Sequence, residues 1–112
     1  MADKPRITFP QRIKVGPLTY RVKLWKKRPA DNARNWGLCD RETCTILIHE
    51  RISRPRFREV LLHEVMHACY DTSGLTMKDD CPEEMVVNDL SFALLGVLRD
   101  NPDLVAFLTA KE

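Results

Sequence analysis

The sequence has few of the residues that mark fibrous, disordered or membrane-spanning chains. Its 112 residues include only 4 glycines, and aromatic residues make up 7%. Apolar runs such as residues 93–98 are short, so no segment has the length of a transmembrane helix. The 44% apolar share and the 30% charged share are ordinary for a soluble globular domain. We therefore expect a single domain over residues 1–112, with residues 1–10 as an extended N-terminal segment.

An export signal is also absent from the start of the sequence. The first residues, Met-Ala-Asp-Lys-Pro, lack the apolar run of a signal peptide, which predicts a cytoplasmic protein without a membrane anchor. In such a compartment cysteines are expected as thiols and not as disulfides. The four cysteines in question are Cys39, Cys44, Cys69 and Cys81.

The net charge is only +2, but the charge is unevenly distributed. Residues 1–60 hold fifteen Lys and Arg against six Asp and Glu, whereas residues 61–112 hold three against ten. A basic sheet layer beside an acidic helical layer would explain this distribution. The alternative is a basic face that meets an acidic partner or a nucleic acid. We favour the first interpretation, because no recognised nucleic-acid motif accompanies the basic residues.

The first half of the chain alternates between apolar and polar residues with period two, the pattern of strands. Residues 11–15 and 18–24 predict a hairpin with one apolar and one basic face, turning at Gly16-Pro17. A second hairpin is predicted over residues 36–40 and 43–49. In its second strand we expect Cys44 to share the buried face of Ile46 and Ile48, and His49 to be an exposed strand-end side chain.

The second half has helical signals. A helix is predicted over residues 54–73, with Ser53 as N-cap, Pro55 in the first turn and Gly74 as the stop. A second helix opens at Asp80 and continues to about Arg99. A short third helix follows Asn101-Pro102-Asp103 and continues to Phe107. Because the strands precede the helices, the predicted fold class is α+β.

The first of these helices carries the strongest functional signal, the motif His63-Glu64-Val65-Met66-His67. Residues at i and i+4 lie one above the other on a helix, so His63 and His67 can direct two ring nitrogens at one ion. Glu64 lies one step round the helix, where it can reach a water on that ion. We expect all three side chains to be buried, at a cost that a metal would offset. This HExxH pattern predicts two zinc ligands and a general base.

A catalytic zinc needs a third protein ligand. Asp71 lies about 11–12 Å from His63 along the helix axis, too far to share the ion, and a hydrogen bond to a ligand histidine suits it better. The first turn of the second helix offers Glu83 and Glu84. Glu83 lies at the centre of the apolar face of this helix and Glu84 about 100° away, so the pattern alone leaves both open.

HExxH followed by a helix with Glu-x-x-(small or apolar)-x-x-(Leu or Phe)-(Ala or Ser) resembles the ImmA/IrrE-type zinc metallopeptidases, most closely their short phage and prophage versions. The resemblance covers residues 36–108 and aligns Leu90-Ser91 with the Phe-Ala of the family, which makes Glu84 the third ligand. Larger members carry additional sensor or DNA-binding segments, for which this chain has no counterpart.

The resemblance implies a minimal zincin domain: a small, mostly antiparallel sheet packed on the HExxH helix, with two further C-terminal helices. It implies zinc-dependent hydrolysis of a specific protein substrate such as a repressor. Glu64 would be the general base, His63, His67 and Glu84 the metal ligands, and Tyr70 a weaker candidate for a second oxyanion donor. It further implies that the strand at 43–49 is an edge strand that holds the substrate in extended form.

Two other interpretations compete with the metallopeptidase hypothesis. The pairs Cys39-x4-Cys44 and His63-x3-His67 have the spacings of a structural zinc site. The gap between them is longer than in zinc fingers, however, and the apolar content is higher than such a site needs. The other alternative is a zincin fold that binds zinc, a partner or nucleic acid without catalysis. Its sequence would contain the same ligands.

Overall fold

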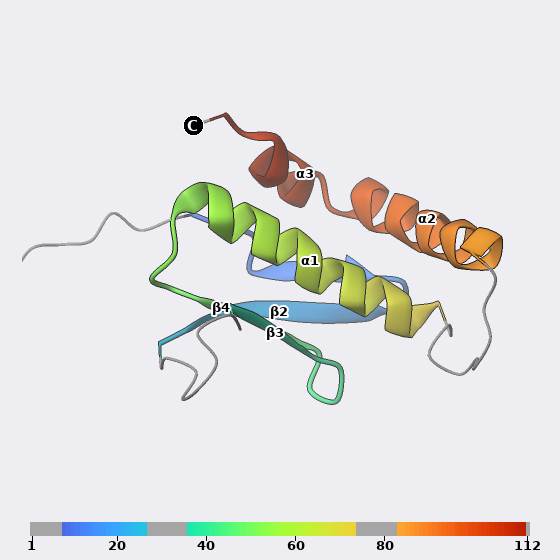
Figure 1. Ribbon diagram of the computed structural model, residues 1–112, viewed down its shortest axis with the longest axis horizontal. Coiled ribbons are helices and arrows are strands. Elements are labelled where there is room, and N and C mark those ends of the chain that lie inside the picture. Colours follow the sequence, from blue (N-terminus) through green and yellow to red (C-terminus); the bar gives the residue numbers. More distant parts are fainter. Residues whose placement is uncertain (1–7, 27–35, 74–82, 112) are drawn as a thin grey trace, which may run out of the picture.

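The computed structural model describes residues 8–26, 36–73 and 83–111, apart from the side chains of Glu83, Glu84, Val87 and Asn88. Four strands are followed by three helices, so the α+β class is confirmed (Figure 1). In chain order they are β1 (Arg12–Val15), β2 (Leu18–Trp25), β3 (Gly37–Asp40), β4 (Thr45–His49), α1 (Arg54–Thr72), α2 (Glu83–Asp100) and α3 (Pro102–Thr109).

The strands form one mixed sheet in the order β1-β2-β4-β3. The pairs β1–β2 and β3–β4 are antiparallel, as predicted for two hairpins, and β2 and β4 are parallel. Because β4 pairs on both sides, β3 is the edge strand. The expectation that residues 43–49 supply the open edge is therefore wrong. The second hairpin joins the sheet through its second strand, and its first strand faces outward.

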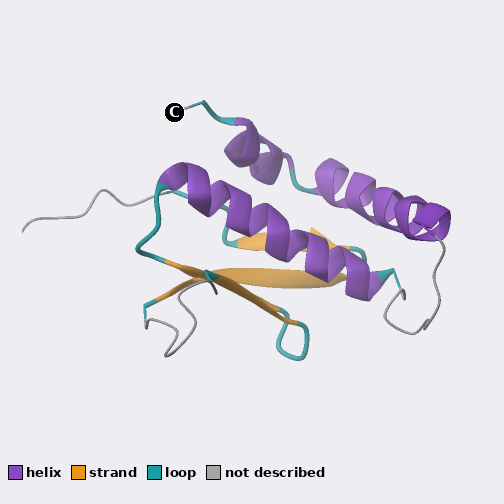
Figure 2. Ribbon diagram, in the orientation of Figure 1, coloured by secondary structure: helices purple, strands orange, loops and turns teal. Residues whose placement is uncertain are grey.

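The core lies between one face of the sheet and α1. Figure 2 shows the strands as one layer and the helices together on one side of it. The period-two pattern places Ile13, Tyr20 and Ile46 on this inner face, where they are fully buried. Helix α1 meets them with Phe57 and Leu61, whose side chains are also buried. The sheet is therefore covered on this face, and its apolar residues account for the position of α1.

The helix boundaries agree closely with the sequence signals. Ser53 is the N-cap of α1, and its hydroxyl oxygen accepts a 3.4 Å hydrogen bond from the Arg56 backbone N–H. Helix α1 ends at Thr72, while the predicted stop at Gly74 and the predicted cap at Asp80 lie outside the described residues. Helix α3 extends two residues beyond the predicted Phe107. None of the described helices is both long and apolar enough to cross a membrane.

The predicted place of Cys44 in the strand and the predicted exposure of His49 are wrong. Cys44 precedes the strand and belongs to the turn. Its φ of 51° is a left-handed value and not that of an extended strand residue. Its side chain is partly buried and packs against the core from that turn. His49 is fully buried and not exposed: its ring lies edge-on to Trp36, and its Nδ1 accepts a hydrogen bond from the Arg51 backbone N–H.

The other edge of the sheet, β1, is closed by the side chain of Asn101 at the junction of α2 and α3. The Lys14 backbone N–H donates to Asn101 Oδ1 at 2.9 Å, and Asn101 Nδ2 donates to the Lys14 carbonyl at 2.9 Å. The same Nδ2 donates to the Val97 carbonyl at 2.8 Å. The amide group thus replaces a neighbouring strand at one residue of β1 and joins the helical layer to the sheet.

We expect Asn101→Ala to lower the free energy of unfolding by about 2–3 kcal/mol, because three backbone groups lose their partner in a largely buried place. Urea unfolding followed by circular dichroism measures this. Thr109→Ala removes one exposed hydroxyl bond on α3 and serves as the control, with a change below about 0.5 kcal/mol. An equal effect of the two substitutions would contradict the bridging role of Asn101.

Candidate metal centre

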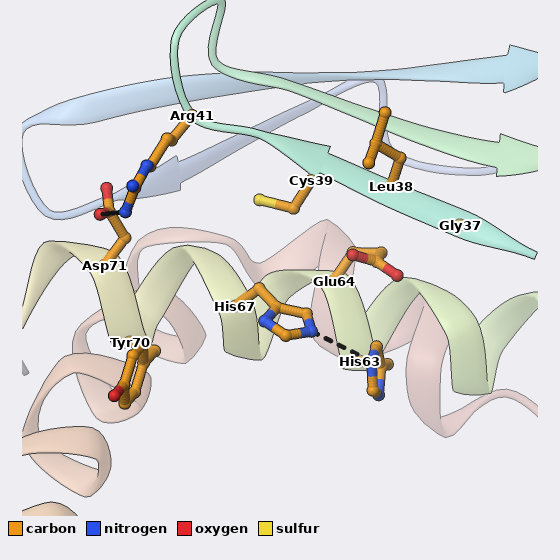
Figure 3. A pocket seen from close by; sticks show the side chains of 9 residues that line it. All are labelled: Gly37, Leu38, Cys39, Arg41, His63, Glu64, His67, Tyr70 and Asp71. Carbon is orange, nitrogen blue, oxygen red and sulfur yellow. Dashed lines mark hydrogen bonds and ion pairs between the residues drawn. The ribbon is translucent and has the colours of Figure 1, made fainter. Parts of the chain in front are cut away.

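The middle of α1 and the edge strand β3 enclose a cavity of about 470 Å³. His63, Glu64 and His67 of the HExxH motif all line it (Figure 3). The strand and its turn contribute Gly37, Leu38, Cys39 and Arg41, and the helix contributes His63, Glu64, His67, Tyr70 and Asp71.

His63 and His67 approach each other as metal ligands would. Their Nε2 atoms are 3.2 Å apart, and the two rings are inclined by 73°. Two imidazole nitrogens bound to one tetrahedral zinc at about 2.0–2.1 Å lie roughly 3.3–3.4 Å apart. The separation in the structure, at which one ring can donate a hydrogen bond to the other, is close to that spacing.

The two histidines are exposed, contrary to the expectation that the whole motif is buried. Helix α1 packs on the sheet through Leu61 and Val65, so His63 and His67 lie on a side that faces the cavity and solvent. Only the expectation for Glu64 is correct, with 6% of its surface exposed. The motif therefore presents two accessible imidazoles beside a buried carboxyl.

The Glu64 side chain points toward β3, between the strand and the histidine pair (Figure 3). Burial raises the pKa of the Glu64 carboxyl above its ordinary value, and the positive charges of His63 and His67 act in the opposite direction. A carboxylate with a raised pKa is a stronger base than an exposed one and therefore a better proton acceptor.

Gly37 allows β3 to come this close to α1. A Cβ atom at this position would lie 2.8 Å from Glu64 Oε2 and 2.6 Å from Val60 Cγ1, closer than such atoms approach in proteins. The contact holds Glu64 against the strand. Sequence reasoning did not single out Gly37, whose only signal is a glycine in a predicted strand, a sign of close approach.

An ion pair lies at one end of the cavity. Arg41, in the turn between β3 and β4, meets Asp71 in the last turn of α1, with 2.6 Å between Arg41 Nη1 and Asp71 Oδ1. The hydrogen bond to Asp71 raises the pKa of Arg41 further above its ordinary value. The prediction that Asp71 hydrogen-bonds a ligand histidine is wrong, because its carboxylate turns to the guanidinium across the cavity. The pair joins strand and helix where the cavity ends.

Tyr70 lies at the rim of the cavity, where it is exposed and points away from β3 (Figure 3). Tyr70 can occupy this rim position because it lies one helical turn after His67. Its phenol lies on the opposite side of α1 from Glu64, so a role as oxyanion donor stays a prediction.

The third ligand is not among the described side chains. Glu83 and Glu84 open α2, which runs antiparallel to α1 and begins beyond its C-terminal end (Figure 1). Farther along α2, Asp89 lines a separate hollow with Thr72. Within the described residues, no three His, Cys, Asp or Glu side chains are grouped to hold a metal ion. Because the side chains of Glu83 and Glu84 lie outside the described part of the structure, Glu84 as the third ligand stays a prediction.

The described cysteines do not form a structural zinc site with the histidines. Cys39, Cys44 and Cys69 are free thiols, as expected, while Cys81 lies outside the described residues. Cys39 lines the cavity, where burial raises the pKa of its thiol to about 11. The Cys44 thiol contacts the Arg41 carbonyl in the turn at 3.8 Å. Two cysteines grouped with two histidines therefore do not occur in the described part of the chain.

Comparison with known proteins identified no relative of this chain. No protein family, no curated protein and no solved structure matches this chain. What the site can do therefore has to be argued from its own geometry.

The contact at Gly37 makes a paired prediction about stability. We expect Gly37→Ala to lower the free energy of unfolding by about 1–3 kcal/mol, because the new methyl group overlaps Val60 and Glu64. Gly96→Ala in α2 is the matched control: nothing lies within 4 Å of its Cβ, and alanine should stabilise the helix by about 0.5–1 kcal/mol. Urea denaturation of both variants measures the difference. Stabilisation by both substitutions would contradict the close approach of β3.

Proposed function

We propose that this protein is a zinc-dependent metallopeptidase. The observation that carries the proposal is the separation of 3.2 Å between His63 Nε2 and His67 Nε2, in a cavity that the buried Glu64 also lines. Two imidazoles that can hold zinc, with a buried carboxyl beside them as general base, are the groups that zinc hydrolases of the HExxH type use. The resemblance to the ImmA/IrrE-type metallopeptidases supports the same function.

His63 and His67 are the residues that would hold the metal, with Glu84 as the proposed third ligand. When bound, zinc supplies a Lewis acid and lowers the pKa of a coordinated water to about 7. In our proposal Glu64 accepts a proton from the attacking water and delivers it to the leaving amine. The wall that β3 forms beside Glu64 shields this carboxylate from bulk water and keeps it directed at the cavity.

The edge strand β3 supports an extended peptide as the substrate. It is unpaired on its outer side among the described residues, and Gly37, Leu38 and Cys39 line the cavity. A peptide that adds to this edge would run along the cavity and bring one of its carbonyl groups toward the histidine pair. We therefore assign to β3 the substrate-holding role first expected of residues 43–49. A specific protein substrate such as a repressor is proposed on the resemblance alone.

We expect Glu64→Gln to bind zinc as the unaltered protein does but to lower peptide cleavage by about 10²–10⁴-fold, because the amide cannot accept a proton. Zinc content is measured by elemental analysis, and cleavage by mass spectrometry of a proteome-derived peptide library. Glu42→Gln is the control, since this exposed residue of the turn between β3 and β4 lines neither the cavity nor the hollow beside it. Full activity of Glu64→Gln would exclude Glu64 as the base.

The ligands are tested by zinc content. One zinc per chain is expected in the unaltered protein, with loss of zinc in His63→Ala and His67→Ala. Glu84→Ala should also lose zinc, whereas Glu83→Ala should retain it. The reverse result for the two glutamates would make Glu83 the third ligand. Zinc binding without cleavage of any peptide would favour a non-catalytic zinc protein on the same fold.

A further inference from the structure

The sheet face opposite the helices carries a compact group of cations. In the described part of the chain all three helices lie on the other side of the sheet (Figures 1 and 2). The period-two pattern directs Arg12 and Lys14 of β1, and Arg21 and Lys23 of β2, to the uncovered side. All four side chains are exposed. We call these four residues the basic face.

The register of β1 and β2 makes the basic face costly for the fold. Arg12 and Arg21 are direct cross-strand partners, and like charges in this arrangement destabilise a sheet. Among the contacts of the described residues, only Lys14 of the four has a carboxylate partner, Asp100 at 3.6 Å. Within the described residues three of the four cations therefore have no carboxylate partner, and no ion pair offsets the placement of Arg12 opposite Arg21.

The spacing of these cations suits a chain of phosphates. Alternate residues along a strand lie about 6.6 Å apart and neighbouring strands about 4.8 Å apart, so the four positive charges occupy one small area of rigid backbone. Acidic residues are concentrated in residues 61–112, and none occurs within β1 or β2; on the same sheet face, Asp40 of β3 lies two strands from Arg21, beyond Thr45. We propose that the basic face binds the phosphate backbone of nucleic acid without reading its sequence.

The composition of the basic face favours nucleic acid over other anionic partners. The centres of protein–protein interfaces are depleted of charged residues and enriched in aromatic ones, whereas protein–DNA surfaces are strongly positive. Binding to a membrane surface needs large apolar side chains beside the cations. Beside the arginine pair this face has the small polar residues Thr19 and Thr45, and the large apolar residues Leu47 and Leu38 lie in the row of Lys23, farther from the pair. Phosphate contacts of this kind give affinity but carry no sequence information.

The test is fluorescence anisotropy of a fluorescein-labelled 20-nucleotide single strand and of a duplex of the same length. Four phosphate contacts predict that the logarithm of the binding constant falls with the logarithm of salt concentration, with a slope of about −2.8 for the single strand and about −3.6 for the duplex. Affinity for the single strand should thus fall roughly 50-fold between 50 and 200 mM salt. A slope near zero for both probes would overturn the proposal.

The double variant Arg12→Gln/Arg21→Gln should bind at least tenfold more weakly at 50 mM salt, with about half the slope. Arg54→Gln/Lys111→Gln is the matched control: it removes the same charge from exposed residues of the helical layer, and its binding should stay within twofold. Equal loss in both double variants would mean that net charge alone acts, and would overturn the assignment to this face. Equally tight binding of a polyglutamate peptide or of phosphatidylserine vesicles would also overturn it.

Thermal unfolding separates loss of binding from loss of fold. Because Arg12→Gln/Arg21→Gln removes a like-charge pair, its unfolding midpoint should be unchanged or higher than that of the unaltered protein. Arg21→Glu provides a second variant, since it places opposite charges across β1 and β2 and should stabilise the hairpin while weakening nucleic-acid binding. A lower midpoint in both variants would contradict the argument that the pair is retained for binding.

Discussion

The close approach of β3 to α1 is the contact on which the site depends. Gly37 lets the strand lie directly against Val60 and Glu64, so the buried carboxyl is held between helix and sheet. The same approach sets the width of the cavity in which His63 and His67 meet. A side chain at residue 37 would separate the two elements and move the carboxyl away from the histidine pair.

One edge of the sheet is closed by a side chain, whereas the other edge is open. Asn101 bonds both backbone groups of Lys14 on β1 and so closes that edge with a side chain from the helical layer. The edge formed by β3 has no strand beside it in the described structure, and it borders the cavity. An open edge strand can pair with another chain and cause aggregation unless a specific partner occupies it. Its position next to the proposed metal ligands makes an extended peptide a reasonable partner.

Local signals predicted the elements well. Alternation over the first hairpin, Ser53 as a cap and the break at Asn101-Pro102 each depend on neighbouring residues, and the structure confirms them. Errors occurred where distant segments meet. Strand β4 became internal because it pairs in parallel with β2, and Asp71 bonds Arg41, thirty residues away, in place of a histidine. Neither partner can be read from a local pattern.

The sequence by itself determined that His63 and His67 share one helix face with Glu64 beside them, since helical periodicity requires no other part of the chain. It could not determine which of these side chains is buried. Tertiary packing decided that, because α1 turns Leu61 and Glu64 toward the sheet and the histidines toward the cavity. It also decided that β3 is the open edge. Strand order depends on pairing between distant segments, and the pairing with the lowest free energy for the whole core is adopted.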